Sequence, residues 1–142
     1  MNMWKWKLRD INRVQKNGLN VFSCFSCGGG STMGYKLAGY TVLGNCEIDE
    51  KINKMYIANH HSKYNYQMDI RQFKEYDNIP DELYQLDILD GSPPCSTFSI
   101  AGDREKSWGK TKVFREGQSA QTLDDLFFEF IDVAERLKPK VI

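Results

Sequence analysis

The chain has 142 residues, of which 41% are hydrophobic and 27% charged, a composition typical of one soluble globular domain. It contains no apolar run near the roughly 18 residues that a membrane span requires, and its N-terminus lacks the apolar stretch of a secretory signal. We therefore expect a cytoplasmic protein without a membrane partner. The 19 basic and 19 acidic side chains cancel, whereas a double-helix binder usually carries a positive surplus. Either the chain binds no nucleic acid, or its main DNA-binding surface lies elsewhere.

The first elements follow a strand–turn–helix pattern. A polar, basic extension at 1–18 ends in an Asn-Gly turn signal and precedes a buried strand over 19–25. A glycine run at 28–30 comes next, where positive φ angles and close approach of a ligand to the backbone are possible. Ser31 or Thr32 is expected to cap the helix that follows.

Strands and helices continue to alternate along the chain. A second strand over 40–47 ends in a carboxylate, and Asp49 caps a helix over about 50–59. A weaker third strand over 64–68 is closed by Asp69. The later expected elements are a short helix around 81–85, a strand over 86–90, a long polar loop over about 96–120, an amphipathic helix and, at Val141 and Ile142, the start of a fifth strand.

The amphipathic helix has the clearest pattern. Thr122 is a natural cap, and Lys138-Pro139 ends the helix. Its expected apolar face, at 3.6-residue spacing, consists of Leu123, Leu126, Phe127, Phe130, Ile131, Ala134 and Leu137.

This order of elements indicates an α/β fold with a mostly parallel sheet and flanking helices. Ligands of such sheets bind beyond the carboxyl ends of the strands. The glycine run, Glu47, Asp69 and a Pro-Pro-Cys sequence at 93–95 each follow a predicted strand. We therefore expect these groups to meet in one site.

Two carboxylates at that edge suit a nucleoside. Glu47 lies about 20 residues after the glycine region, where an acid can accept both hydroxyl hydrogens of a ribose. Asp69 is placed to accept from the exocyclic amine of an adenine, and a helix-capping role for it is nearly as plausible from the sequence.

Cys95 is the candidate nucleophile. Pro93 and Pro94 stiffen the backbone that carries the thiol, and the thiol follows a strand end that faces the expected crevice. Oriented backbone amides and nearby basic side chains would raise its thiolate fraction. The alternative, an inert buried thiol, does not explain the double proline or the long polar loop.

Cys24 and Cys27 form a C-x-x-C pair, a spacing that also occurs in zinc-binding and redox sites. A structural zinc site needs four ligands, and the adjacent His60 and His61 lack the spacing of a finger. We expect ordinary thiols and no metal.

Several motifs occur in the order seen in the DNA cytosine-5 methyltransferase family, which the chain resembles over about residues 19–142. They are Phe25-Ser26-Cys27-Gly28-Gly29-Gly30, Glu47-Ile48-Asp49, Gly91-Ser92-Pro93-Pro94-Cys95-Ser96-Thr97-Phe98-Ser99 and Leu126-Phe127-Phe128-Glu129-Phe130. The resemblance implies a Rossmann-like methyltransferase fold dependent on S-adenosylmethionine, in which the 1–18 extension precedes a partial catalytic domain over 19–142.

The resemblance also implies roles for individual residues. Cys95 would attack carbon 6 of a flipped-out cytosine in DNA, so that carbon 5 can take the methyl group and S-adenosylhomocysteine is left. Ser96, Arg104 and Lys106 of the loop would lie near phosphate or the displaced base. The expected cofactor contacts are Phe25, Ser26, Gly28, Gly29, Gly30, Glu47, Ile48, Asp69, Ile70, Pro93 and Leu126.

The sequence departs from the family pattern in two ways. Cys27 stands where the family normally has glycine. The sequence also ends before the Glu-Asn-Val motif and the target-recognition region. We therefore expect an incomplete enzyme, inactive alone, of bacterial or phage origin with a restriction–modification role. The alternatives are a non-catalytic or split half that needs a complementary C-terminal chain, and a nicotinamide-dependent or thiol-redox Rossmann domain.

Overall fold

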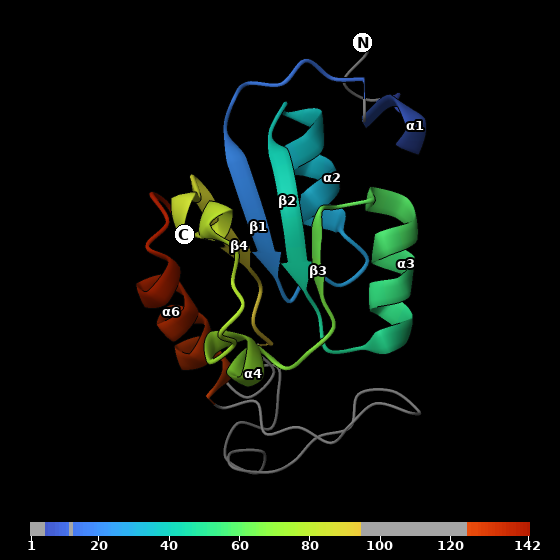
Figure 1. Ribbon diagram of the computed structural model, residues 1–142. Coiled ribbons are helices and arrows are strands. Elements are labelled where there is room, and N and C mark those ends of the chain that lie inside the picture. Colours follow the sequence, from blue (N-terminus) through green and yellow to red (C-terminus); the bar gives the residue numbers. More distant parts are fainter. Residues whose placement is uncertain (1–4, 12, 95–124) are drawn as a thin grey trace, which may run out of the picture.

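The computed structural model describes residues 5–11, 13–94 and 125–142. Its centre is a parallel four-stranded sheet in the order β3-β2-β1-β4 (Figure 1). The strands are β1 (Asn20–Cys24), β2 (Thr41–Cys46), β3 (Tyr64–Tyr66) and β4 (Ile88–Gly91). Beyond β4, Val141 forms a parallel bridge with Ile88. The parallel sheet, its four strands and the start of a fifth at Val141 are thus confirmed.

Helices cover the sheet on both sides (Figure 1). One layer contains α2 (Gly30–Leu37) and α3 (Glu50–His60), and α1 (Leu8–Ile11) contacts α2. The opposite layer contains α4 (Ile70–Lys74), the 3₁₀ helix η1 (Asp81–Gln85) and α6 (Leu126–Leu137). Within the described part of the chain, no helix is long and apolar enough to cross a membrane.

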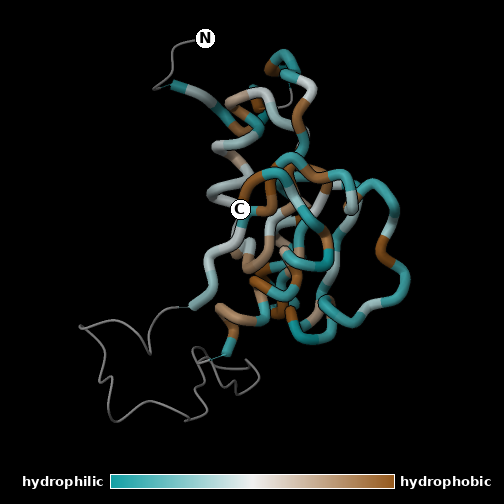
Figure 2. The backbone as a smooth tube through the Cα atoms, turned by 90° about the vertical axis from the view of Figure 1, so that its left-hand side faces the viewer, coloured by the Kyte–Doolittle hydropathy of each residue, from teal (hydrophilic) through white to brown (hydrophobic). Residues whose placement is uncertain are grey.

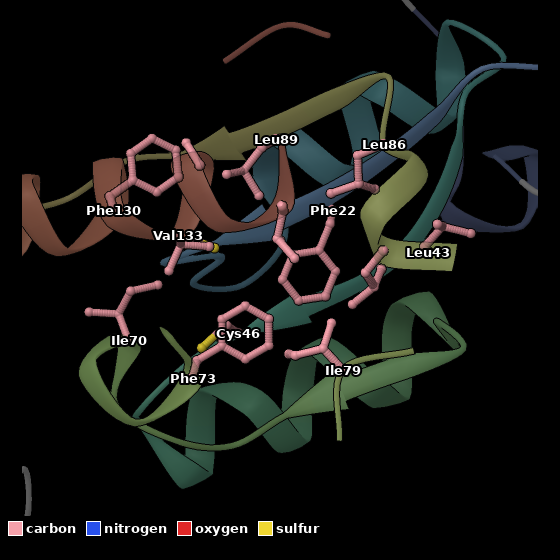
Figure 3. Close-up of a cluster of buried hydrophobic side chains, with 14 of the residues drawn as sticks. Phe22, Leu43, Cys46, Ile70, Phe73, Ile79, Leu86, Leu89, Phe130 and Val133 are labelled. Carbon is pink, nitrogen blue, oxygen red and sulfur yellow. The ribbon is translucent and has the colours of Figure 1, made fainter. Parts of the chain in front are cut away.

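The hydrophobic core lies between the sheet and the layer of α4, η1 and α6. Phe22 is fully buried and stacks on Phe73 of α4, with ring centroids 5.3 Å apart and 8° between the ring planes. Leu89 of β4 and Val133 of α6 close the same cluster, which Figure 3 shows around Phe22. The interior segments of the backbone are accordingly largely hydrophobic, and the peripheral loops are hydrophilic (Figure 2).

The other face of the sheet, under α2 and α3, buries polar side chains instead. Asn45 of β2 is fully buried, and its Nδ2 donates to Asn53 Oδ1 of α3 at 2.8 Å and to Ser26 Oγ at 2.9 Å. Thr32 Oγ1 of α2 and Tyr56 OH of α3 share a hydrogen bond of 2.9 Å. Since strand side chains alternate between faces, one face is apolar and the other carries a hydrogen-bond network.

The predicted cap of α2 is wrong. The N-cap is Gly29, with φ 87° in the left-handed region, and it makes no side-chain cap hydrogen bond. Ser31 and Thr32 lie inside the first turn, where their hydroxyls bond other elements. Ser31 Oγ donates to Asp90 Oδ2 at 2.9 Å, and Thr32 bonds Tyr56.

The predicted apolar face of α6 needs correction at Phe127 and Val133, and the predicted face residue Ile131 is only half-buried. Phe127 is 49% exposed, whereas Val133, absent from the expected face, is 1% exposed. The helix turns by about 100° per residue, so Phe127 lies a third of a turn from its buried neighbour Leu126. The expected cap Thr122 and the face residue Leu123 lie outside the described residues; the observed N-cap is Asp125. The buried face is Leu126, Phe130, Val133, Ala134 and Leu137.

The basic N-terminal segment packs onto the domain. Ile11 is 2% exposed. Asn17 donates from its backbone nitrogen to Gly39 O at 3.0 Å and from Nδ2 to Ala38 O at 3.2 Å. This segment therefore fixes the C-terminal end of α2, the helix whose N-terminus lies at the site.

Candidate functional site

The loops that follow the strands share one edge of the sheet. Cys24, the last residue of β1, pairs in register with Cys46 of β2 and with Gly91 of β4, and Cys46 pairs with Tyr66 of β3. The turn over 25–30, Glu47 and Asp69 thus all lie at the carboxyl ends of the strands, as predicted. Cys95 lies outside the described residues, four positions after Gly91.

The turn after β1 places three positive φ angles at every second residue. They are 52° at Phe25, 45° at Cys27 and 87° at Gly29. Of the three glycines, for which the sequence made positive φ possible, only Gly29 adopts it. A glycine would adopt the left-handed conformation of Cys27 without steric cost.

Glu47 connects this turn to the end of β2. Its side chain is largely buried, and Oε2 accepts from Cys27 N at 2.9 Å. Oε1 accepts from Asp49 N at 3.0 Å, while the Glu47 amide donates to Tyr66 O at 3.0 Å. Because a carboxylate oxygen has two acceptor positions, each oxygen can accept one further hydroxyl hydrogen from a ligand. The two backbone hydrogen bonds thus fix the orientation of the carboxylate, and its predicted contact with a ribose remains a prediction.

Ser26, within the turn, is held by the buried side chain of Asn45. It is 5% exposed, and its Oγ accepts from Asn45 Nδ2. Phe25, half-buried, packs edge-on against the ring of Phe130 on α6, with centroids 6.3 Å apart. These contacts hold Phe25 and Ser26 in the segment Phe25–Cys27, which carries two of the positive φ angles.

Asp69 has the capping role that the sequence left open. Its Oδ1 accepts from Arg71 N at 2.9 Å at the start of α4. The Arg71 guanidinium also pairs with Asp69 at 3.1 Å and with Asp125 at the start of α6. The nearby positive charge holds the pKa of Asp125 below its ordinary value. Contact of Asp69 with an adenine remains a prediction.

The other predicted site residues differ in how deeply their side chains are buried. Ile48 and Pro93 are half-buried close to the carboxyl edge. Ile70 and Leu126 are only 4% and 2% exposed and belong to the hydrophobic core, so both side chains serve packing in this structure. Their cofactor contacts remain predictions. The predicted loop residues Ser96, Arg104 and Lys106 lie outside the described residues.

The described cysteines differ in burial. Cys24 is buried in the hydrophobic core while Cys27 is exposed, and both are thiols. Burial raises the pKa of Cys24 well above its ordinary value, so its thiol stays protonated at neutral pH. Cys46 beside it is also buried, with a raised pKa. Among the residues placed by the structure, no three potential metal ligands cluster.

Three residues near the turn escaped the sequence analysis. Asn45 positions Ser26, His60 of α3 packs behind Gly29, and Asp90 of β4 accepts from Ser23 Oγ at 2.8 Å and from Ser31. Only Asn45 and Asp90 could have been identified from the sequence, because each is a polar residue within an otherwise apolar strand. The role of His60 depends on the packing of α3 against the turn.

A parallel sheet, a glycine-containing turn after the first strand and an acid ending the second are typical of α/β domains that bind nucleotide-containing cofactors. The chain matches the C-5 cytosine-specific DNA methylase family over residues 19–142, and it belongs to that family.

Relatives from bacteria and a phage support this assignment. The chain is 32% identical over 144 residues to the type II methyltransferase M.Sau96I of Staphylococcus aureus, covering 98% of this chain and 30% of that protein. It is 30% identical over 128 residues to M.NgoPII of Neisseria gonorrhoeae, covering 87% and 32%. It is 31% identical over 124 residues to the orphan methyltransferase M.Rho11sI of Bacillus phage rho11s, covering 86% and 22%. The chain therefore spans a third or less of the length of these relatives.

A solved structure has the same fold. It is described as a putative DNA modification methyltransferase encoded within a prophage of E. coli. The match has a TM-score of 0.56 at 23% identity and covers 86% of this chain and 30% of that one. The predicted Rossmann-like methyltransferase architecture is thereby confirmed.

Proposed function

We propose that the chain provides the cofactor-binding and nucleophile-bearing part of a DNA cytosine-5 methyltransferase that uses S-adenosylmethionine. Family membership supports the reaction class. The observation that carries the cofactor assignment is Glu47, whose carboxylate is fixed between the amides of Cys27 and Asp49 at the carboxyl edge of a parallel sheet.

The residues present fit an adenosyl cofactor. Glu47 has one acceptor position left on each oxygen for the two ribose hydroxyls. Gly28, Gly29 and Gly30 offer backbone without side chains for close contact with the methionine part, and Ile48 lies beside Glu47, where an adenine ring would be flanked. The cofactor supplies a methyl group on a positively charged sulfur, which makes the methyl an electrophile.

Cys95 is the proposed nucleophile. Its thiolate forms a bond to carbon 6 of cytosine, and the electron pair moved to carbon 5 then takes the methyl group. A base removes the proton from carbon 5, and the sulfur–carbon 6 bond breaks to return the thiolate. The cytosine must leave the DNA stack for this chemistry, with Ser96, Arg104 and Lys106 proposed to contact phosphate or the displaced base.

The 142 residues alone are expected to transfer no methyl group to DNA. They correspond to about 30% of the length of the M.Sau96I relative, and their 19 basic and 19 acidic side chains give no positive surplus for phosphate. DNA binding is proposed for the whole enzyme, with the remaining parts present in one chain or supplied by a complementary one. A filter assay with labelled methyl donor tests this expectation, which measurable transfer by the 142 residues would overturn.

Calorimetric titration with S-adenosylhomocysteine tests the cofactor assignment. We expect binding by the 142-residue chain and a loss of about tenfold or more in affinity for Glu47→Ala, since a tenfold change corresponds to about 1.4 kcal/mol. Glu135→Ala, which removes an exposed carboxylate of α6, is the matched control and should bind as the unaltered chain does. Binding of NAD in place of S-adenosylhomocysteine would instead support the nicotinamide alternative.

A further inference from the structure

His60, the last residue of α3, lies directly behind the glycine turn. The residue is 3% exposed. A Cβ atom added to Gly29 would lie 2.1 Å from His60 Nε2 and 2.5 Å from its Cδ2, so the imidazole edge fills the space that any larger residue at position 29 would need. In Figure 1 the segment between β1 and α2 passes beside α3, consistent with this contact.

The imidazole is held from both helices of this layer. Its ring centroid is 4.7 Å from that of Tyr56, which is fully buried and bonds Thr32 of α2 through its hydroxyl. The His60 carbonyl accepts from the buried Lys36 Nζ of α2 at 2.6 Å. His60 therefore has little freedom to move away from Gly29 without disturbing the contact between α2 and α3.

Neither ring nitrogen of His60 has a hydrogen-bond partner among the described residues. Burial lowers the pKa of His60 from its ordinary value, and the positive charge of Lys36 and the neighbouring His61 lower it further, while the Gly28 backbone opposes the shift. Lys36 from α2, Tyr56 and His61 are the titratable groups that face it. The ring is thus neutral at pH 7, and it packs against Gly29.

We propose that His60 is a positioning residue that holds Gly29, and with it the turn over 25–30, in the conformation that receives the cofactor. The inference rests on the proposed function, since it concerns the adenosyl site. The turn also carries the Cys27 amide that donates to Glu47, two residues from Gly29. Displacement of Gly29 would therefore be transmitted to the carboxylate proposed to bind the ribose.

The proposed role of His60 predicts that cofactor affinity depends on pH. A buried histidine with a lowered pKa contributes stability when neutral, and this contribution is lost as the pH falls below the ordinary value of about 6.5. Protonation adds a charge and a second N–H donor to a ring in a pocket where only the Gly28 backbone favours the protonated form, so the ring would move from Gly29 and disturb the turn. Cofactor affinity should then fall with pH over the range in which His60 takes up its proton.

The test combines calorimetry and NMR on the 142-residue chain. S-adenosylhomocysteine is titrated at about pH 7.5 and at a lower pH, below the midpoint that NMR measures for the His60 ring, because that midpoint lies under the ordinary value of about 6.5. The unaltered chain is expected to lose about tenfold in affinity at the lower pH, and His60→Gln, which stays neutral, is expected to lose much less. His61→Gln is the matched control, since His61 is exposed, and it should keep the full loss. In NMR, the Gly29 amide and the His60 ring should titrate with one midpoint.

Each outcome decides between the two proposals. If the unaltered chain does not bind, or Glu47→Ala binds equally well, the proposed function fails. If Glu47→Ala weakens binding but the unaltered chain and His60→Gln share one pH profile, the role of His60 is overturned. Should His60→Gln not fold, the NMR titration decides alone: a Gly29 amide that does not follow the His60 ring contradicts the inference.

Discussion

The backbone amide of Cys27 donates to Glu47 Oε2 at 2.9 Å, joining the turn after β1 to the end of β2. The second oxygen of the same carboxylate accepts from Asp49, the cap of α3. One side chain thus ties together a turn, a strand and a helix. Its geometry is set by the fold before any ligand arrives, which is the condition for a preorganised binding group.

Glu47→Gln is therefore expected to destabilise the chain. The amide of glutamine keeps one acceptor and turns a donor toward Cys27 or Asp49, leaving one buried N–H without an acceptor. The expected loss in unfolding free energy is about 1–3 kcal/mol, the cost of such a group. Urea unfolding followed by circular dichroism measures it, and a stability equal to that of the unaltered chain would contradict the geometry of this carboxylate.

Gly29 and Gly30 are adjacent, but substitution by alanine is expected to affect the stability of the chain differently at the two positions. Gly29→Ala places a methyl group against the buried His60 ring at a left-handed φ of 87°, and should cost about 3 kcal/mol. Gly30→Ala meets nothing within 4 Å in the first turn of α2, and should be neutral or stabilise by up to about 1 kcal/mol. Equal effects of the two substitutions on thermal unfolding would refute the described turn.

Cys27→Gly should stabilise the chain by about 1 kcal/mol, because glycine adopts the left-handed conformation of this residue without strain. Phe25 has a similar φ of 52°, but Phe25→Gly would also lose the ring contact with Phe130, so it should not stabilise. The comparison by differential scanning calorimetry separates backbone strain from packing. A loss of stability in Cys27→Gly would show that its thiol makes a larger contribution than its backbone costs.

The corrected face of α6 can be tested with two phenylalanines. Phe130→Ala removes a ring that is 7% exposed and should cost about 3–5 kcal/mol. Phe127→Ala removes a ring that is 49% exposed and should change the unfolding free energy by no more than about 0.5 kcal/mol. A large loss of unfolding free energy in Phe127→Ala would instead support the buried face that was predicted from the sequence.

The strands and their order in the chain could be predicted because each is a short apolar run followed by a turn signal. Both of these signals are local, and so is the cap of α3 at Asp49, which the structure confirms. The convergence of the glycine turn, Glu47 and Asp69 at one edge also followed, since parallel strands end at the same side of a sheet.

The details of the turn could not be predicted. Positive φ angles at Phe25 and Cys27 are unfavourable for their residue types, so propensity favours other conformations, and tertiary contacts override it. The burial of His60 against Gly29 depends on how α3 crosses the turn, which no local pattern encodes. Phe127 was misassigned because an aromatic residue beside the buried face satisfies a loose helical period.

The most direct test of the account is an amide NMR titration of the 142-residue chain with S-adenosylhomocysteine. If Glu47 and the glycine turn form the cofactor site, the largest chemical-shift changes will fall on residues 25–30 and 47–49, and Glu47→Ala will reduce them. Changes confined to other surfaces, such as the groove of about 400 Å³ lined by Lys74, Asp132 and Arg136, or no changes at all, would contradict it.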